Sequence, residues 1–341
     1  MKATNKIGFA VVGLGSIAQS SVLPAFAHSK RATLVALVSR DKKKAQKLAR
    51  KFKAESAYGN DEYAACLTTP EVSAIYIATP QGEHEMLTVK AAEARKHVLC
   101  EKPLAATVEQ SARMVQACRQ HRVLLMTAYR KYFEPSALYL KKLIRDGSLG
   151  RIDVIHTAFS ELHSPGKSPA WLLDKRVAGG GPLMDLGVYC VNTSRWLVDE
   201  DPVEVSAQAW RHDPVRFSEV EEGISFRMNF ASGLVVQATS TYGAAPSSFL
   251  NVQGTKGWAS LAPAFPFEEE RWVTGKIQGR WFEREFKVVD EFAPELDAFA
   301  AAIQTGSAVE PTGVQGHRDV VIIHSIYESA KRQVPVVVKY E

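Results

Sequence analysis

An acid and a lysine stand directly after an apolar strand in the run Val98-Leu99-Cys100-Glu101-Lys102-Pro103. The run lies downstream of a Gly-rich turn, Gly13-Leu14-Gly15-Ser16-Ile17-Ala18, which also follows an apolar strand. Open α/β sheets bind ligands at the carboxyl ends of their parallel strands. A lysine ammonium held there can hydrogen-bond a substrate hydroxyl and stabilise negative charge that develops on it. Together the two runs predict a nicotinamide-dependent enzyme, although spacing alone does not distinguish Lys102 from a solvated loop lysine.

A second group that could do chemistry is the run from Gly179 to Tyr189, in which a proline begins a helix after three glycines. The glycines let the backbone approach a ligand closely. Asp185 and Tyr189 are four residues apart and are expected to share one helical face, which Asn192 and Trp196 extend. A phenol can exchange a proton once a nearby cation lowers its pKa. From the residues alone, a buried tyrosine with a satisfied hydroxyl and a capping aspartate is the stronger interpretation.

The Gly-rich turn has the context that dinucleotide binding requires, since it lies between a strand and a helix of a βαβ unit. Gly13 permits the tight turn, Gly15 lets the backbone approach the pyrophosphate, and Ala18 keeps helix and strand close. The N-terminus of the helix adds N–H groups and a partial positive charge. We therefore expect residues 13–17, Leu14, Ser16 and Ile17 included, to bind the cofactor.

The second strand ends in Ser39 and Arg40, where NAD-binding sites usually place an acid for the ribose 2′-hydroxyl. A hydroxyl and a guanidinium suit a 2′-phosphate, and Lys44 lies one helical turn further on. The alternative is that Asp41 binds the ribose, but Asp41 is well placed as a helix cap. The pattern favours NADP over NAD.

The segment Thr79-Pro80-Gln81-Gly82-Glu83-His84 follows another strand end, where the nicotinamide ribose could pass. A plain strand-to-helix turn with a surface histidine fits its spacing equally well.

Composition limits the class of protein. A chain of 341 residues suggests two domains, and 46% apolar with 23% charged residues is ordinary for a packed soluble protein. No apolar run is long enough to cross a bilayer. Residues 1–6 are polar and glycines interrupt the apolar run that follows, so a buried strand and turn are expected there and not a signal peptide. The four cysteines have no metal-binding spacing, so we expect reduced thiols and no metal.

The net charge of +5 comes largely from a basic run over residues 40–53. Such a run is usually a solvated helix face, but here it begins where a cofactor's adenosine end should lie. Nucleic-acid binding is less favoured because no recognised motif accompanies the charge.

Alternating elements predict the architecture of the first part. Buried strands are expected at 7–12, 34–38, 74–78, 98–100 and 123–127, with helices at 41–52, 84–94 and 107–122 and a helix kinked near Pro24. Asp41 should cap the first of these helices, and Thr107 with Gln110 should form a capping box. Continuous apolar strands alternating with amphipathic helices favour a doubly wound parallel sheet, a Rossmann fold.

The second part has a different pattern. Helices are expected at 135–146, 182–198, 294–305 and 316–333, a Pro-, Ser- and Gly-rich loop at 163–181, and strands at 203–211, 224–230, 234–242, 249–253 and 334–338. Short turns between strands favour antiparallel neighbours. We expect an NADP-binding domain at 1–128 and, at 129–341, an α+β domain for substrate binding and oligomerisation. The last helices could pack back on the first domain.

In these motifs the chain resembles the glucose-fructose oxidoreductase and inositol dehydrogenase (Gfo/Idh/MocA) family of NAD(P)-dependent enzymes. The resemblance runs from about Lys6 to the C-terminus. It rests on Gly13-Leu14-Gly15, Thr79-Pro80, His84, Glu101-Lys102-Pro103, Tyr129-Arg130, the Gly179 to Tyr189 run, Val252-Gln253-Gly254-Thr255-Lys256-Gly257 and Ser329-Ala330.

The resemblance implies an active site between a Rossmann domain and an α/β domain, with Lys102 and Asp185 as catalytic residues. Many members have histidine where this chain has Tyr189. One branch of the family has tyrosine at this position, and in this respect the chain resembles that branch. It comprises glucose-fructose oxidoreductase, NADP-dependent xylose dehydrogenases and dimeric dihydrodiol dehydrogenases. Ser39-Arg40 matches the NADP-using members, and Tyr242 matches a tyrosine near the active site.

The resemblance thus completes the expected site. Catalysis is assigned to Lys102, Tyr189 and Asp185. Substrate contacts are assigned to Lys102, Arg130, Asp185, Tyr189 and Tyr242. Cofactor contacts are assigned to Gly13, Leu14, Gly15, Ser16, Ile17, Ser39, Arg40, Lys44, Thr79, Pro80, Gln81, His84, Glu101, Lys102, Arg130 and Trp171.

Two departures from the family pattern matter. Relatives often read Trp-Arg before the triple glycine, whereas this chain has Trp171-Leu172, so Lys175 or Arg176 could replace the arginine. The export signal and N-terminal arm of glucose-fructose oxidoreductase are not seen. We therefore expect a cytoplasmic enzyme that releases its cofactor. The antiparallel sheet of the second domain could offer a face for self-association, as in relatives, so a homo-oligomer, a dimer or tetramer, is also expected.

The expected activity is NADP-dependent oxidation of a sugar or polyol, most simply an aldose at C1. Lys102 would orient and polarise the reacting oxygen, Tyr189 would exchange the proton, and Asp185 would order the site. One alternative is a trans-dihydrodiol or carbonyl reductase with an apolar pocket. The other is a non-catalytic NAD(P)-sensing regulator, which Lys102, Tyr189 and the lack of a DNA-binding motif argue against.

Overall fold

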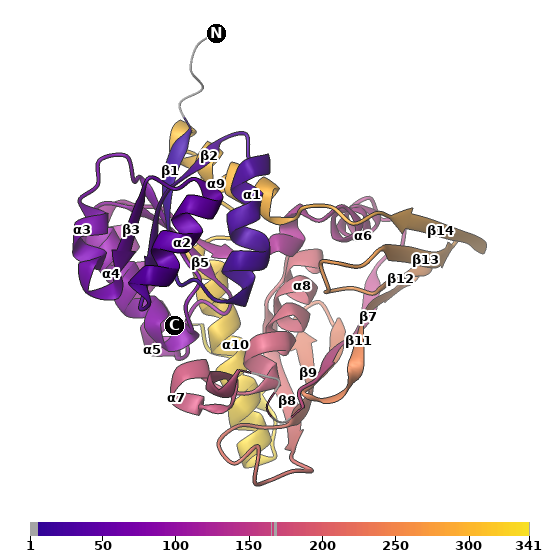
Figure 1. Ribbon diagram of the computed structural model, residues 1–341. Helices are drawn as coiled ribbons and strands as arrows, with labels where there is room; N and C mark the ends of the chain where they lie inside the picture. Colours follow the sequence, from indigo (N-terminus) through magenta and orange to yellow (C-terminus); the bar gives the residue numbers. More distant parts are fainter. Residues whose placement is uncertain (1–5, 165, 167–168, 341) are drawn as a thin grey trace. The chain divides into compact units, whose positions relative to one another are not determined.

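The computed structural model describes residues 6–164, 166 and 169–340. The chain divides into two compact units, Met1–Arg130 with Asp290–His317, and Lys131–Val289 with Arg318–Glu341 (Figure 1). In the described part of the chain, no helix combines the length and the apolar character needed to cross a lipid bilayer.

The first unit is built on a six-stranded parallel sheet with the order β3-β2-β1-β4-β5-β6. This confirms the predicted doubly wound Rossmann sheet. The strand order reverses between β1 and β4, and such a reversal creates the crevice in which doubly wound sheets bind ligands. The strands are β1 (Ile7–Val12), β2 (Ala32–Ser39), β3 (Ser56–Gly59), β4 (Ala74–Ile77), β5 (His97–Glu101) and β6 (Leu125–Ala128).

The predicted helix signals of this unit are confirmed. The Asp41 carboxylate accepts a hydrogen bond from the Lys44 N–H, and both bonds of the Thr107–Gln110 capping box form. A wide helical turn, Ala18–Val22, precedes Pro24 at the start of α1, so the helix is irregular where a kink was expected. The helices are α1 (Leu23–His28), α2 (Lys42–Phe52), α3 (Tyr63–Leu67), α4 (His84–Glu93) and α5 (Val108–His121).

Helix α9 (Phe292–Thr305) also belongs to the first unit, although it follows the strands of the second in the chain. The Asp297 carboxylate accepts hydrogen bonds from the Ser29 hydroxyl at 2.6 Å and from the backbone N–H of Arg31 at 2.8 Å. The ring of Phe299 packs 6.1 Å from that of Phe9 in β1. Polar and apolar contacts therefore both attach α9 to the Rossmann sheet.

The second unit contains a nine-stranded sheet with the order β14-β13-β12-β11-β7-β10-β9-β8-β15. Only the β7–β10 pair is parallel among the strand pairs of the described residues, so the predicted, mostly antiparallel sheet is confirmed. The strands are β7 (Ile152–Leu162), β8 (Pro202–Trp210), β9 (Gly223–Phe230), β10 (Val235–Thr241), β11 (Gly243–Gly254), β12 (Gly257–Ala262), β13 (Arg271–Ile277), β14 (Arg280–Phe286) and β15 (Val336–Val337).

One face of this sheet carries helix α8 (Val188–Val198), as Figure 1 shows. The Thr157 hydroxyl of β7 lies 3.5 Å from the Cys190 sulfur of α8. The other helices are α6 (Pro135–Arg145), α7 (Lys175–Ala178) and α10 (Gly313–Arg332), and α10 runs from the first unit into the second. The prediction of a loop over 163–181 was wrong in part, because this segment contains α7 and a helical turn at Ala170–Leu173. Residues 165, 167 and 168 of the predicted loop lie outside the described residues.

Candidate active site

The Gly-rich turn shows two different uses of glycine. Gly13 has φ = +90°, and a Cβ there would lie 2.5 Å from the Ala78 carbonyl oxygen, so the fold itself requires glycine. At Gly15, a Cβ would meet no heavy atom within 4 Å, and Ser16 beside it is exposed. The turn therefore leaves open space next to the backbone of Gly15, as a bound pyrophosphate needs.

Two buried side-chain oxygens lie at the end of β4 without hydrogen-bond partners among the described residues. They are Oγ1 of Thr79 and Oε1 of Gln81. The Thr79 Cγ2 atom is one of the atoms that a Cβ on Gly13 would meet, at 2.8 Å, so this segment borders the Gly-rich turn. A buried polar atom without a partner costs about 1–3 kcal/mol, which a ligand's hydroxyl or amide groups would offset. These residues therefore fit a dinucleotide.

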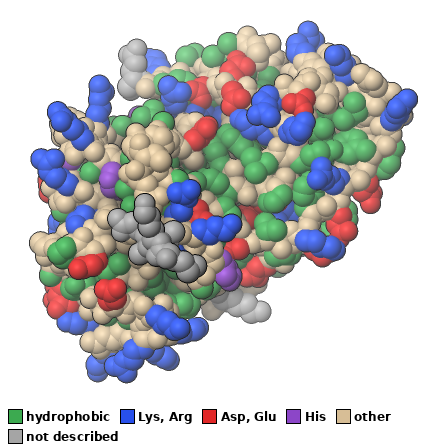
Figure 2. Space-filling model, turned by 90° about the horizontal axis from the view of Figure 1, so that it is seen from above, with side chains coloured by type: hydrophobic (Ala, Val, Ile, Leu, Met, Phe, Trp, Pro, Cys, Tyr) green, Lys and Arg blue, Asp and Glu red, His purple; other side chains and the backbone are tan. Residues whose placement is uncertain are grey.

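Ser39, Arg40 and Lys44, which were assigned to the adenosine end of the cofactor, lie at the end of β2 and in the first turn of α2. Ser39 is buried, and its hydroxyl accepts a hydrogen bond from the Asp41 N–H at 3.2 Å, while Asp41 caps α2. Arg40 is exposed and Lys44 is half-buried. Figure 2 shows Lys and Arg side chains spread over the visible face, with several of them together at its lower left edge. Helix α2 itself carries Lys42, Lys43, Lys44, Lys47, Arg50 and Lys51. Because Asp41 is engaged as a cap, Ser39 and Arg40 are the better candidates for a 2′-phosphate.

His84 connects two loops of the first unit. It is fully buried, with Nε2 2.8 Å from the Thr79 carbonyl oxygen and Nδ1 3.1 Å from that of Leu104. Burial lowers the pKa of its imidazole. It is not the surface histidine that one interpretation of the sequence suggested. Its ring nitrogens face the protein backbone, and it thereby ties the Thr79 segment to the loop after Lys102.

At the end of β5, the Glu101 carboxylate is held from two sides. Oε1 accepts a hydrogen bond from the Tyr76 hydroxyl at 2.8 Å, and Oε2 accepts one from the Lys102 N–H at 3.3 Å. Burial raises the pKa of the Glu101 carboxyl, which Lys102 and Tyr76 partly oppose. Glu101 thus fixes the backbone from which the half-buried Lys102 side chain extends.

Arg130 is 6% exposed and forms an ion pair with Glu291, at the N-cap of α9. The resemblance to the family assigned Arg130 to cofactor and substrate contacts, and the sequence analysis did not predict this ion pair. The carboxylate orients the guanidinium within the first unit, and the assignment to a ligand stays a prediction.

In the second unit, Asp185 lies in a wide helical turn, Leu183–Gly187, that leads into α8. Its Oδ2 accepts a hydrogen bond from the Tyr242 hydroxyl at 3.0 Å. The Tyr242 ring stacks on His163, with ring centroids 3.8 Å apart. Burial, and then the Asp185 charge, raise the pKa of Tyr242 well above its ordinary value, so this phenol stays a donor. Tyr242, which was predicted to lie near the site residues, therefore contacts one of them, Asp185, directly.

Tyr189 is 8% exposed and packs against two phenylalanines, Phe159 at 5.9 Å and Phe265 at 5.7 Å between ring centroids. Asn192 and Trp196, which were expected to extend its face, have structural contacts. Asn192 donates to Asp319 at 2.8 Å, and Trp196 packs against Tyr132. The wide turn Leu183–Gly187 covers part of the chain between Asp185 and Tyr189, so it changes the helical phase that the four-residue spacing of these two residues assumes.

The triple glycine is shaped by packing that sequence reasoning missed. The Glu221 carboxylate accepts hydrogen bonds from the N–H groups of Gly181 and Leu183, both at 3.1 Å, and from the Tyr327 hydroxyl at 2.8 Å. A Cβ on Gly181 would lie 2.5 Å from the Glu221 carbonyl oxygen, and one on Gly180 would lie 2.1 Å from the Tyr327 hydroxyl. These glycines are thus explained by close packing of the protein, and the expected approach of a ligand is not needed to explain them.

Trp171 is half-buried and Leu172 is buried, whereas Lys175 and Arg176 are exposed. Arg176 forms an ion pair with Asp174 at 3.1 Å, and the replacement of the expected arginine by Lys175 or Arg176 stays a prediction. The predicted residues divide between the units: Lys102 and Arg130 lie in the first, and Trp171, Asp185, Tyr189 and Tyr242 in the second.

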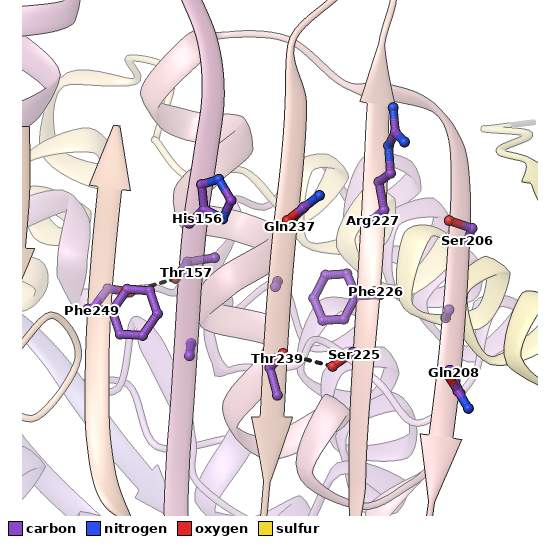
Figure 3. Close-up of a pocket in the computed structure, with 13 residues that line it drawn as sticks. His156, Thr157, Ser206, Gln208, Ser225, Phe226, Arg227, Gln237, Thr239 and Phe249 are labelled. Atoms are coloured by element: carbon purple, nitrogen blue, oxygen red, sulfur yellow. Dashed lines mark hydrogen bonds between the residues drawn. The ribbon is translucent and has the colours of Figure 1, made fainter. Parts of the chain in front are cut away.

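A groove of about 480 Å³ lies on the other face of the nine-stranded sheet, across β7 to β11 (Figure 3). Figure 3 shows His156, Gln237, Arg227 and Ser206 on neighbouring strands, and the strand register places them in one row. Among the described residues that line it, none belongs to the predicted site. This groove is therefore a separate surface.

Comparisons with known proteins agree with this fold and these motifs. Residues 7–129 match the model of the oxidoreductase family with an NAD-binding Rossmann fold, and residues 137–260 match the GFO/IDH/MocA C-terminal domain. D-xylose 1-dehydrogenase (NADP(+)) of Haloarcula marismortui is 32% identical, over 96% of this chain and 92% of that protein. Trans-1,2-dihydrobenzene-1,2-diol dehydrogenase of Danio rerio is 26% identical, over 92% of this chain and 91% of that protein.

Among solved structures, aldose-aldose oxidoreductase from Caulobacter crescentus, complexed with glycerol, has a TM-score of 0.93 and 32% sequence identity. The match covers 98% of this chain and 100% of that one. The length and identity of these matches show that the chain belongs to the Gfo/Idh/MocA family of oxidoreductases.

Proposed function

We propose that this protein is an NADP-dependent oxidoreductase that oxidises an aldose at C1. The observation that carries the proposal is that Glu101 fixes the backbone of Lys102 at the end of β5 in the first unit. The second unit, taken by itself, adds the hydrogen-bonded pair of Asp185 and Tyr242. Support comes from the D-xylose dehydrogenase, which is 32% identical over nearly its whole length. Bound NADP supplies the hydride acceptor.

Each residue has a defined task in this proposal. Lys102 hydrogen-bonds the reacting hydroxyl of the sugar and stabilises negative charge on its oxygen. Tyr189, in its phenolate form, would accept the proton of the C1 hydroxyl, and the hydride of C1 would pass to a bound NADP, so that the aldose becomes a lactone. Asp185, fixed by Tyr242, orients the sugar, and Arg130 and Trp171 complete the contacts. Correct orientation itself supplies much of the acceleration.

The choice of NADP over NAD depends on the end of β2. Ser39 and Arg40 stand where an acid would favour NAD, and Asp41 is engaged as the cap of α2. A guanidinium forms charge-assisted, often bidentate hydrogen bonds with a phosphate. We assign the 2′-phosphate to Ser39, Arg40 and Lys44.

The test is an assay of the purified protein with NADP and a panel of aldoses, followed by nicotinamide absorbance. Sustained reduction is expected, and no reduction with any aldose would refute the aldose assignment. Lys102→Ala and Tyr189→Phe should each lower turnover roughly tenfold or more while NADPH still binds. Lys90→Ala, an exposed lysine on α4, and Tyr139→Phe, a tyrosine packed on Phe286, are matched controls.

A second candidate is oxidation of a trans-dihydrodiol, or reduction of a carbonyl. The similarity to the Danio rerio enzyme and the aromatic surroundings of Tyr189 favour it. Direct competition between an aldose and an aromatic dihydrodiol in one assay decides between the two substrates, since the better substrate suppresses turnover of the other.

We also propose that copies of this chain associate through the face of the nine-stranded sheet that lies opposite α8, which we call its outer face. Trp258, Trp272 and Trp281 are 37%, 37% and 61% exposed, and strand register places them on the same face as the groove of Figure 3. Exposed aromatic patches mark protein interfaces. Sedimentation should give a dimer or larger species that Trp281→Glu weakens, and a monomeric wild-type protein would refute the proposal.

A further inference from the structure

Glu221 is a buried acid of the second unit to which the proposed reaction gives no task. Its Oε2 accepts a hydrogen bond from the Gly181 N–H at 3.1 Å. Its Oε1 accepts from the Leu183 N–H at 3.1 Å and from the Tyr327 hydroxyl at 2.8 Å. Burial raises the pKa of the Glu221 carboxyl, and these donors act against that rise, because they favour the charged form. Both oxygens of Glu221 therefore serve as acceptors for the segment that leads to Asp185.

Gly181 carries this contact on to Asp185. Its N–H is held by Glu221, and its carbonyl oxygen accepts a hydrogen bond from the Asp185 N–H at 3.3 Å. The packing around Gly181 is close, since a Cβ there would lie 2.5 Å from the Glu221 carbonyl oxygen. Asp185 itself is half-buried in the wide turn Leu183–Gly187. Its backbone is thus fixed through Glu221, while the residue stays partly accessible.

The side chain of Asp185 is held from the same place in the chain by a second path. Its Oδ2 accepts a hydrogen bond from the Tyr242 hydroxyl at 3.0 Å. The Tyr242 N–H donates in turn to the carbonyl oxygen of Glu222 at 2.9 Å, and the Thr241 hydroxyl donates to the same oxygen at 3.0 Å. Because Glu222 directly follows Glu221, the two paths close a ring of hydrogen bonds around Asp185.

The two adjacent acids that close the ring are themselves fixed. They lead into β9, which pairs with β10 in antiparallel register. The Glu222 carboxylate also accepts a hydrogen bond from the Asp213 N–H at 3.0 Å. A wide helical turn by itself fixes a side chain less well than a regular helix. The anchor that holds Asp185 in place therefore belongs to the sheet.

We propose that Glu221 is a positioning residue for Asp185: its carboxylate fixes the backbone of the Asp185 turn, and the ring through Tyr242 and Glu222 sets the direction of the Asp185 carboxylate. A polar network whose members are all satisfied makes a site rigid. All members of this ring lie in the second unit. The effect on turnover rests on the proposed function, in which Asp185 orients the sugar, but the ring itself does not.

The first experiment needs neither substrate nor cofactor. It measures hydrogen–deuterium exchange of the purified protein on peptides that cover residues 181–187 and 240–244. Glu221→Gln keeps the size of the side chain but replaces one acceptor oxygen by an NH2 group, so exchange in both segments should become roughly tenfold faster. Tyr242→Phe removes only a hydroxyl and should speed exchange over 181–187. Unchanged exchange over 240–244 in Glu221→Gln, or over 181–187 in Tyr242→Phe, would overturn the ring whether or not the protein oxidises sugars.

Glu134→Gln is the matched control for this experiment. Glu134 is also a buried carboxylate of the second unit that accepts hydrogen bonds from backbone N–H groups, at 2.8 and 2.9 Å. Its replacement should destabilise the fold without a selective effect on residues 181–187 and 240–244. Selectively faster exchange of the same two segments in Glu134→Gln would mean that they report general stability, and it would overturn the assignment to Glu221.

The second experiment tests the effect on turnover with a double-mutant cycle. Glu221→Gln and Tyr242→Phe should each lower kcat roughly tenfold and leave the dissociation constant for NADPH unchanged, because the Rossmann sheet belongs to the other unit. Since either break already releases Asp185 from the ring, the double variant should lose no more than the weaker of the two single variants. Losses in kcat that multiply would show that the two residues act independently and would contradict the proposal. A wild-type protein that oxidises no aldose but gives the expected exchange results would refute the proposed function and support the ring.

Discussion

The Tyr242 hydroxyl donates a hydrogen bond to Oδ2 of Asp185, with 3.0 Å between the two oxygens. Tyr242 directly follows β10, and its own N–H bonds to the Glu222 carbonyl oxygen at 2.9 Å. Asp185 lies in a wide helical turn, which by itself fixes a side chain less well than a regular helix. The sheet therefore sets the position of the carboxylate that we assign to the substrate.

Tyr242→Phe should lower turnover roughly tenfold, since a hydrogen bond to a charged group contributes about 1.5–3 kcal/mol. The fall should appear in kcat more than in the affinity for NADPH, because Tyr242 and the Rossmann sheet belong to different units. Steady-state kinetics and a fluorescence titration with NADPH measure the two quantities. Tyr139→Phe is the control, and a Tyr242→Phe enzyme with full turnover would show that Asp185 does not need this contact.

The two glycines of the cofactor turn should respond differently to alanine. Gly13→Ala should lower the melting temperature strongly, because Cβ would lie 2.5 Å from the Ala78 carbonyl oxygen at φ = +90°. Gly15→Ala should leave the melting temperature unchanged, because its Cβ enters open space, but it should weaken NADPH binding by filling that space. Differential scanning fluorimetry with a binding titration checks both outcomes, and a Gly15→Ala protein that binds NADPH normally would argue against this turn as the pyrophosphate site.

Arg40→Ala should raise the dissociation constant for NADP roughly tenfold and leave that for NAD nearly unchanged, because only NADP carries the 2′-phosphate. The loss should shrink at high salt, since ions screen an exposed guanidinium. Arg50→Ala, near the far end of α2, is the matched control. An equal loss for both cofactors, or a wild-type protein that binds NAD more tightly, would contradict the assignment.

Sequence patterns predicted the elements in which local signals and burial agree. The apolar strands of the Rossmann sheet, the Asp41 cap and the Thr107–Gln110 box needed no distant partner. Strand β7, in the middle of the second sheet, was missed, because His156 and Ser160 on its outer face interrupt the apolar pattern. Strand β3 was missed because it is short and depends on pairing with β2.

The site shows the same limit. Lys102, Asp185 and Tyr189 were proposed from motifs. Glu221 and Tyr327 were not identified from the sequence, because they reach the triple glycine only through the fold. The sequence did contain a signal that Glu295 of α9 is buried. Glu291, Glu295 and Phe299 follow one another at four-residue spacing, so two acids stand on the apolar face of α9. A charge on an apolar face indicates a partner, but the sequence does not say which residue that partner is.

A buried charge cluster in the second unit predicts how stability depends on pH. Glu134 caps α6 through the N–H groups of Ser136 and Ala137, at 2.8 and 2.9 Å, and forms an ion pair with Lys131 at 3.0 Å. Arg271 lies 3.7 Å away, and all three charged side chains are 1% exposed or less. Burial opposes the charge of Glu134, but Lys131, the Ser136 bonds and Arg271 outweigh it and lower the pKa of the carboxyl to about 2.

Because the pKa of Glu134 is lower in the folded chain than its ordinary value of 4.5, its contribution to stability is complete above pH 4.5 and is lost as pH falls toward 2. The shift corresponds to about 3 kcal/mol in the free energy of unfolding. Glu134→Gln should therefore destabilise the protein at pH 7, and its difference from wild type should narrow between pH 5 and 3. Urea unfolding across that range measures the difference, with exposed Glu283→Gln as the control. A difference that stays constant over this range would mean that Glu134 stabilises α6 by its shape and hydrogen bonds alone, without its charge.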